Sequence, residues 1–305
     1  MRSMLGWVFA AAFLAITPTT VAAKDKPPLA VTVDPSMPWN VDFGDEKCRL
    51  SRIFGEGENQ HFLYFEQHAP STYAAMTVSG SGFKRFRDRR ETQIHLFDAQ
   101  EPLKTDPLPG DTEEFGKALI YSGINLEAGD GSQKPRSERK SDAERSTSIG
   151  TVFLDTDFAA KTEYLNFEQG KHSVRLNTGP LGEAFKVLNQ CTGGLVTAWG
   201  LDLEQHKTMT RKPEWTNQAS IARRVQDSYP SAALRKGESA IFRMRVIVDE
   251  EGAVAECIMN KTTVADSLES PACKEMRSAE FKPALDAQGR PMRSYYVTSI
   301  TYSIG

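Results

Sequence analysis

The most specific stretch of the chain is residues 229–252, which read YPSAALRKGESAIFRMRVIVDEEG. The opening tyrosine-proline pair predicts a short helix over 231–236 that Gly237 closes, because proline favours the start of a helix and glycine the position just past its end. Apolar residues then alternate over 240–249, which predicts a strand with one face on a core. The final DEEG predicts a turn that folds the next strand back antiparallel.

The residues that follow complete a small α+β unit. We expect a second strand over 253–260 and a short helix over 270–281, where Ser270 and Pro271 are suited to the N-cap and the first helical position. Alternation resumes over 293–304 and predicts a closing strand. The order helix, strand, strand, helix, strand indicates a three-stranded antiparallel sheet with two helices.

The order and spacing of these pieces over residues 228–305 resemble the C-terminal domain of TonB. The matching residues are Tyr229-Pro230-x-x-Ala233, Gly237, Val248-Asp249-Glu250-Glu251-Gly252, Phe281-Lys282-Pro283-Ala284, Gly289-Arg290-Pro291 and the aromatic-rich last strand. The resemblance implies helices on one face of the sheet. It also implies binding of a TonB-box segment of an outer-membrane TonB-dependent receptor, or of another envelope protein, as an added strand. The family's glutamine three residues before Tyr-Pro, implicated in that contact, corresponds to Gln226.

The last strand is the expected binding edge. If residues 293–304 pair with one neighbour only, their outer edge presents N–H and C=O groups that an extended peptide can satisfy. Val297, Ser299 and Thr301 are expected on the solvent face, where they would select among peptides, and Gln226 would contribute if the family correspondence holds. Alternatively, a loop, the N-terminal domain or a second copy of the chain covers this edge.

Two features depart from the TonB transducer. Cys257 and Cys273 are not part of its pattern, and no long Pro-rich or Lys-Pro spacer precedes residue 229.

The composition is that of a globular protein, with 305 residues, 25% charged residues and a net charge of −3. That length suffices for two domains with their own cores. A slightly acidic balance carries no electrostatic footprint for nucleic acid, so we expect no nucleic-acid partner.

Residues 1–23 have the features of a secretory signal peptide. Arg2 precedes an apolar run over 4–16, and small residues occupy the −3 and −1 positions before Lys24. Cleavage there places the mature chain in the periplasm, in contact with the membrane only through its partners. The alternative is an uncleaved inner-membrane anchor, although the run is shorter than the ~20 apolar residues that a spanning helix needs.

An exported chain favours disulfides over free thiols. Its four cysteines allow three pairings. We expect bonds Cys48–Cys191 and Cys257–Cys273, because each would tie a helix to a sheet within one domain. A metal site is the alternative, but the cysteines are scattered and no histidine lies near one at ligand spacing, so no metal or other cofactor is expected.

The rest of the chain is expected to form one further domain. We predict an extended lead-in at 24–40, a strand-rich domain at 41–200 with a flexible loop at 129–148, and a linker at 201–227. The period changes to helical over 180–199, with a plausible break at its two central glycines. The strands of this domain are expected at 48–54, 61–66, 73–79, 92–97, 149–154, 162–167 and 173–176.

The run Lys84–Arg90, KRFRDRR, has two interpretations. It could bind an anionic envelope polymer or a lipid headgroup. We favour the commoner use of such a run, which is a solvated loop or the protection of a sheet edge.

Two function classes remain. No catalytic residues can be assembled, because the five histidines are far apart and no nucleophile motif is present. We therefore expect a periplasmic module that binds an extended peptide and is linked to TonB-dependent transport. The alternative is an enzyme with its site in the N-terminal domain, for which the TonB-like domain serves in docking. A deep polar pocket within 41–201 would favour the enzyme, and an open sheet edge would favour the binding module.

Overall fold

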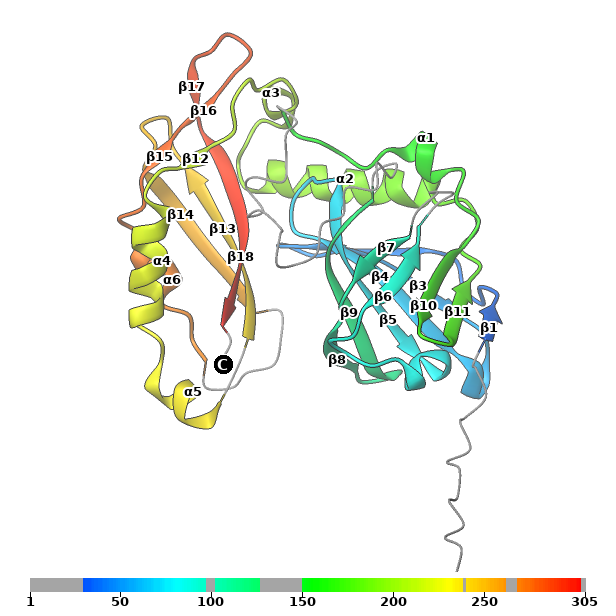
Figure 1. The fold of residues 1–305 in the computed structure, drawn as a ribbon. Helices are drawn as coiled ribbons and strands as arrows, with labels where there is room; N and C mark the ends of the chain where they lie inside the picture. The colour runs from blue at the N-terminus through cyan, green and yellow to red at the C-terminus, as the bar shows by residue number, and fades with distance from the viewer. Residues whose placement is uncertain (1–29, 97–101, 127–149, 238–239, 262–267, 303–305) are drawn as a thin grey trace, which may run out of the picture.

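The structure is a computed structural model that describes residues 30–96, 102–126, 150–237, 240–261 and 268–302. Its α+β architecture consists of two domains that lie side by side (Figure 1). The expected signal peptide and the expected flexible loop at 129–148 lie outside the described residues.

The N-terminal domain is built on two sheets. Alternating apolar residues form the larger sheet, in which every pairing is antiparallel and the strand order is β2-β3-β4-β5-β9-β8. Its strands are β2 (Asn40–Phe43), β3 (Cys48–Phe54), β4 (His61–Gln67), β5 (Tyr73–Gly80), β8 (Leu108–Thr112) and β9 (Gly116–Asn125). Short 3-10 turns, η1 (Gly57–Asn59) and η2 (Ser81–Arg85), follow β3 and β5.

The second sheet has the order β1-β11-β10-β6-β7. Its strands are β1 (Ala30–Val33), β6 (Thr92–His95), β7 (Leu103–Thr105), β10 (Leu165–Gln169) and β11 (His172–Leu176). All its pairings are antiparallel except that of β1 with β11. The expected lead-in at 24–40 is therefore wrong in part, because residues 30–33 gain a partner 143 residues further along the chain.

Helix α2 (Gly182–Ala198) packs against β2 and β3. It buries Phe185, Leu188 and Leu195 in the N-terminal core, and Phe185 meets Phe65 of β4 edge-on. The helix continues through its two glycines instead of breaking, since Gly193 leaves room for Leu203 of α3 (Leu203–Lys207) at close range.

The strand expected at 149–154 does not form. Asn189 of α2 takes both main-chain groups of Leu154, donating to its carbonyl oxygen (2.9 Å) and accepting from its N–H (3.0 Å). Asp155 then caps α1 (Thr156–Ala159) by accepting from the N–H of Phe158.

The C-terminal domain has the predicted three-stranded antiparallel sheet, in the order β14-β13-β18. The strands are β13 (Ala240–Val248), β14 (Val254–Lys261) and β18 (Ser294–Tyr302). Phe242, Met244 and Val246 point to one face, where they pack against Val225 and Met276 of the helices. Those helices are α4 (Gln218–Asp227), α5 (Ser231–Lys236) and α6 (Ala272–Met276).

The linker expected at 201–227 is mostly part of the folded domains. It contains α3, α4 and strand β12 (Glu214–Trp215), which pairs with β15 (Phe281–Lys282). That pairing also ends the helix expected over 270–281 early, because Phe281 is needed in the ladder. A second small ladder joins β16 (Ala284–Leu285) to β17 (Pro291–Met292).

Candidate functional site

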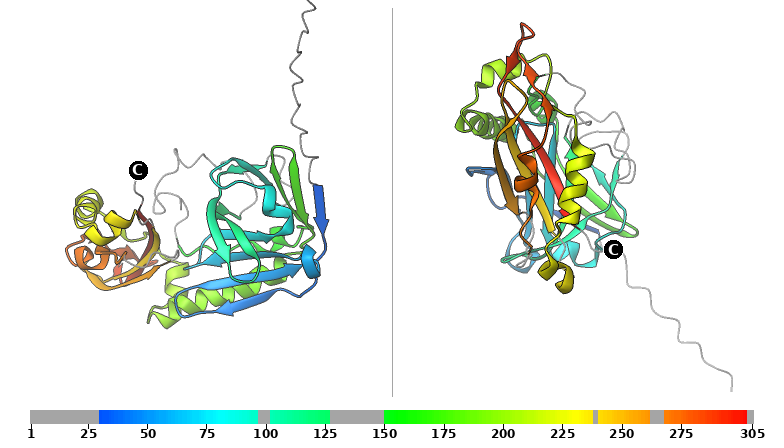
Figure 2. Two further views of the ribbon diagram at one scale, coloured as in Figure 1. Left: turned by 90° about the horizontal axis from the view of Figure 1, so that it is seen from below. Right: turned by 90° about the vertical axis from the view of Figure 1, so that its left-hand side faces the viewer.

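The helices cover only one face of the C-terminal sheet, and the other face points toward the N-terminal domain (Figure 1, Figure 2). The period of two places Arg243, Arg245 and Ile247 of β13 on this helix-free face, paired with Ser299, Val297 and Tyr295 of β18. The face therefore carries both charged and apolar side chains.

One half of the helix-free face is buried against the N-terminal domain. Tyr295 packs on the rings of Trp199 (5.2 Å between centroids) and His206 (5.6 Å), and Ile247 belongs to the N-terminal core. His206 donates from Nδ1 to the carbonyl oxygen of Asp202 (2.6 Å) and accepts at Nε2 from the hydroxyl of Ser294 (3.0 Å). Burial lowers the pKa of His206, so this side chain connects the domains in its neutral form.

Arg245 makes the charged contact between the domains. Its side chain is only 7% exposed, and its guanidinium lies over the ring of Trp199 at 4.7 Å. It donates two hydrogen bonds to Glu46 of the N-terminal domain (3.1 and 2.9 Å) and one to Glu256 of β14 (3.1 Å). A buried guanidinium needs such partners, because desolvation without them is costly.

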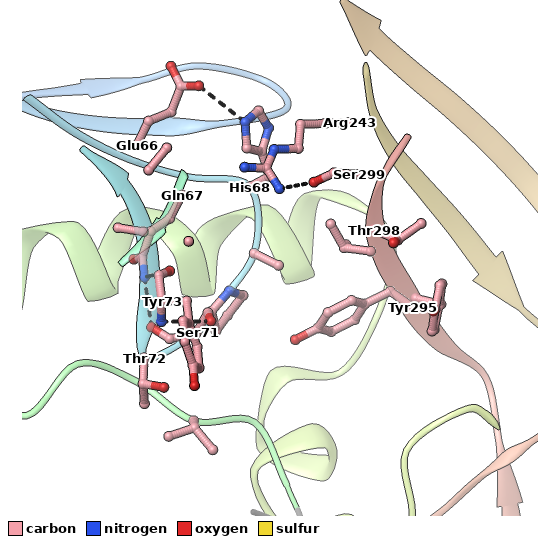
Figure 3. Close-up of a pocket in the computed structure, with 18 of the residues that line it drawn as sticks. Glu66, Gln67, His68, Ser71, Thr72, Tyr73, Arg243, Tyr295, Thr298 and Ser299 are labelled. Carbon is pink, nitrogen blue, oxygen red and sulfur yellow. Dashed lines mark hydrogen bonds and ion pairs between the residues drawn. The ribbon is translucent and has the colours of Figure 1, made fainter. Parts of the chain in front are cut away.

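The other half of this face borders a cavity of about 530 Å³ between the domains, which we call the interdomain groove (Figure 3). The C-terminal sheet forms one wall of the groove. The end of β4 and the β4–β5 turn form the opposite wall. The side chains that line the two walls include Ile241, Arg243, Val297, Ser299 and Thr301 on the first, and Glu66, Gln67, His68, Ser71 and Tyr73 on the second.

Hydrogen bonds order the N-terminal wall of the groove. Gln67 is 3% exposed and donates from Nε2 to the carbonyl oxygens of Ser71 (2.7 Å) and Tyr73 (2.9 Å). The hydroxyl of Ser71 accepts from the N–H of Tyr73 (2.9 Å). The β4–β5 turn therefore presents a pre-formed surface to the groove.

The charges around the groove are divided between its walls. Burial disfavours ionisation of Glu66, but His68 (3.2 Å), Arg49 (2.7 Å) and Lys47 (3.4 Å) surround its carboxylate and hold its pKa well below the usual range. Across the groove, Arg243 donates to the hydroxyl of Ser299. Lys212 also lines the groove, and burial lowers its pKa. The groove combines an ionised carboxylate, surrounded by cations, on one wall with the guanidinium of Arg243 on the other.

Strand β18 is an edge strand, as predicted. Among the strands of the described ranges it pairs with β13 alone, over the full register from Ser294 to Tyr302. The described residues of the N-terminal domain, which was one of the expected covers for this edge, contribute no strand to the C-terminal sheet and lie across the groove.

The structure brings together three of the four residues expected to bind a partner. Val297, Ser299 and Thr301 all line the groove. Gln226 does not line it, because it lies exposed near the end of α4, a helix that packs on α6 over the opposite face of the sheet. Sequence reasoning did not identify Arg243 or Lys212 as groove residues, although an arginine within an otherwise apolar strand was a usable signal. The N-terminal wall carried no comparable signal.

Each domain contains one of the two expected disulfides. Cys48 of β3 bonds Cys191 of α2, and Cys257 of β14 bonds Cys273 of α6. Within the described ranges no cluster of histidine, cysteine and acidic residues could hold a metal ion. No helix in those ranges has the length and apolarity needed to cross a membrane.

Residues 225–304 match the family model of the Gram-negative bacterial TonB protein C-terminal domain. The C-terminal domain is thus a TonB C-terminal-type domain, and the match supports a general role as a TonB-like protein of the cell envelope. The matched range does not include the N-terminal domain. No curated protein and no solved structure shows significant similarity to the chain.

Proposed function

We propose that the protein binds an extended segment of an outer-membrane receptor, or of another envelope partner, by adding it as a strand to β18. The observation that carries this proposal is that β18 is the edge strand of the sheet and borders the interdomain groove. An extended peptide that pairs with a sheet edge gains main-chain hydrogen bonds, and pockets for alternate side chains give it specificity. The proposal links the protein to TonB-dependent transport from the periplasmic side.

The walls of the groove suit a peptide in extended conformation. Val297 and Thr301 lie on the same face of β18, two strand positions on either side of Ser299, so they would contact alternate side chains of an added strand. The turn ordered by Gln67 lies opposite and leaves about 530 Å³ for those side chains. Because this wall belongs to the N-terminal domain, we propose that both domains select the peptide.

A backbone-modified peptide tests strand addition directly. A synthetic TonB-box peptide is titrated into the mature two-domain chain by isothermal calorimetry, beside analogues that are N-methylated at single amides. Successive amides of an added strand point alternately toward and away from β18. We expect methylation to abolish binding at every second amide and to be tolerated at the amides between. Equal binding of all analogues by a folded chain would exclude main-chain pairing.

Paired proline variants locate the edge on the protein. Only one of Val297→Pro and Thr298→Pro removes an outward N–H, because neighbouring residues of a strand alternate in direction. We expect the outward variant to stay folded and lose the peptide, and the inward variant to weaken the β13–β18 ladder. Gln226→Ala should bind as the wild type does, since Gln226 is remote from the groove. Weaker binding by Gln226→Ala would restore the role that the family correspondence gives it.

A further inference from the structure

One end of the N-terminal domain concentrates positive charge. Turn η2 and the loop that follows it expose five basic side chains, and the β10–β11 turn adds a sixth beside them. Slight burial and the charges of Arg85, Lys171 and Arg90 lower the pKa of His172, which shows that the two segments converge. We call the six residues the basic tip: Lys84, Arg85, Arg87, Arg89, Arg90 and Lys171.

The backbone under the basic tip is fixed by one buried side chain. Gln169 is 3% exposed; it accepts from the N–H of Arg87 (2.7 Å) and donates to the carbonyl oxygens of Arg87 (2.9 Å) and Arg90 (3.1 Å). Arg89, with φ of 55°, donates its N–H to the carbonyl oxygen of Pro107 (2.7 Å). The main-chain polar groups thus bond inward while the charged side chains are exposed, so little backbone entropy remains to be lost on binding.

Two acidic residues, Asp88 and Glu91, lie in the loop that carries Arg87, Arg89 and Arg90. Within the same loop, Asp88 forms an ion pair with Lys117 (3.5 Å), and Glu91 is exposed. The whole chain carries a net charge of −3, so the six cations of the tip are a local reversal of the overall sign. Clustered charge of one sign attracts oppositely charged surfaces over distances set by ionic strength.

The folded chain begins beside the basic tip. Strand β1 runs parallel to β11 and pairs Ala30 with Ser173, two positions from Lys171 (Figure 1). The tip therefore lies on the side of the domain at which the described chain begins.

We propose that the basic tip docks the protein on the phosphate headgroups of an anionic phospholipid surface. Lysine and arginine bind phosphate oxygens through charge-assisted hydrogen bonds, and each basic residue near an anionic leaflet adds to the attraction. Six basic side chains spread over two segments match an extended array of headgroups better than they match a single small anion. The proposal takes the lipid interpretation of the basic run Lys84–Arg90 in preference to a solvated loop or the protection of a sheet edge. It goes beyond the proposed peptide binding and does not depend on it.

Vesicle sedimentation with two matched variants tests the proposal. The mature chain from Lys24 is mixed with vesicles of phosphatidylcholine alone or with phosphatidylglycerol. One variant is Lys84→Gln/Arg87→Gln/Arg90→Gln, and the control is Arg223→Gln/Arg235→Gln/Arg277→Gln, which removes the same charge from exposed residues of the C-terminal domain. We expect binding to the anionic vesicles only, weakened at least about tenfold in the first variant and less than about twofold in the control.

Thermal unfolding of both variants shows whether they are folded, since exposed substitutions should leave the melting temperature unchanged. Equal losses in the two variants would mean that net charge alone attracts the protein, and would overturn the proposal. Failure of the wild-type chain to prefer anionic vesicles would also overturn it. Binding to soluble polyphosphate without binding to vesicles would identify an anionic polymer as the ligand of the basic tip and would also overturn the proposal.

Discussion

The two domains close their cores over very different distances along the chain. In the C-terminal domain the main sheet is one hairpin plus a closing strand, and its disulfide spans 16 residues. In the N-terminal domain β1 pairs with β11, and Cys48 bonds Cys191 across 143 residues. The C-terminal domain therefore keeps a recognisable pattern in its sequence, whereas the N-terminal domain depends on contacts that no short stretch of sequence reveals.

The C-terminal domain is also the less self-sufficient of the two. Ile247 of β13 packs in the N-terminal core, and Arg245 finds one of its carboxylates on Glu46 of the N-terminal domain. Its helix-free face is therefore completed by the other domain.

Removing each disulfide should give the largest difference in stability between the two domains. The chain-entropy model gives a loss in the free energy of unfolding of about 5 kcal/mol for Cys48→Ala/Cys191→Ala and about 3 kcal/mol for Cys257→Ala/Cys273→Ala, because the first closes the longer loop. Urea unfolding measures the loss, and hydrogen exchange assigns it to a domain. A larger loss in the second variant would contradict the account of the N-terminal domain as the long-range one.

Removing Arg245 should uncouple the domains. Arg245→Ala leaves Glu46 without its buried partner, and we expect a loss of about 3 kcal/mol, in the range for breaking a buried ion pair. Thermal unfolding should then show two transitions where the wild type shows one. The matched control is Glu256→Gln, whose side chain is 43% exposed and which should cost less than about 1 kcal/mol. A single transition in Arg245→Ala would show that the apolar contacts alone join the domains.

Mild acid should weaken the N-terminal domain and spare the C-terminal one. His61 is fully buried; it donates from Nδ1 to the carbonyl oxygen of Asn59 (2.8 Å) and accepts at Nε2 from the N–H of Gly82 (2.8 Å). Burial lowers the pKa of His61, so the unfolded chain binds a proton more readily than the folded one. This stability is present above about pH 6.5 and is lost as the pH falls toward the folded pKa.

Burial also lowers the pKa of His206 at the domain interface. All five histidines precede residue 207. Hydrogen exchange at pH 7.5 and pH 5.5 should therefore show lost protection in the N-terminal domain and around Ser294, which bonds His206, while the rest of the C-terminal domain is spared. His61→Gln should reduce this pH dependence, even though it lowers stability at neutral pH. Equal loss of protection in the two domains would assign the acid response to another group.

The sequence predicted the strands whose own residues alternate. The alternation over 240–249 and 293–304 was sufficient for β13 and β18, although these two strands pair with each other across 46 to 62 residues. It was not sufficient for Leu154, whose main chain bonds Asn189, or for Trp215, which pairs with Phe281. Their conformation depends on partners that local propensity does not encode.

The candidate site follows the same division. The residues on β18 were predictable because a strand alternates its faces, so Val297, Ser299 and Thr301 had to lie together. The Gln67 wall and Lys212 belong to segments that meet the sheet only through the packing of the two domains. Gln226 was predicted as a binding residue from the family correspondence alone. In the structure it lies on α4, over the helix-covered face of the sheet.

The disulfide connectivity affects how the two bonds can form while the chain emerges with its N-terminus first. Both bonds join cysteines that are consecutive in sequence, the first with the second and the third with the fourth. An oxidase that couples each cysteine to the next one to emerge therefore produces the native pairs without isomerisation. The first thiol must nevertheless wait until 143 further residues have appeared, so the N-terminal domain cannot be locked before most of the chain has been delivered.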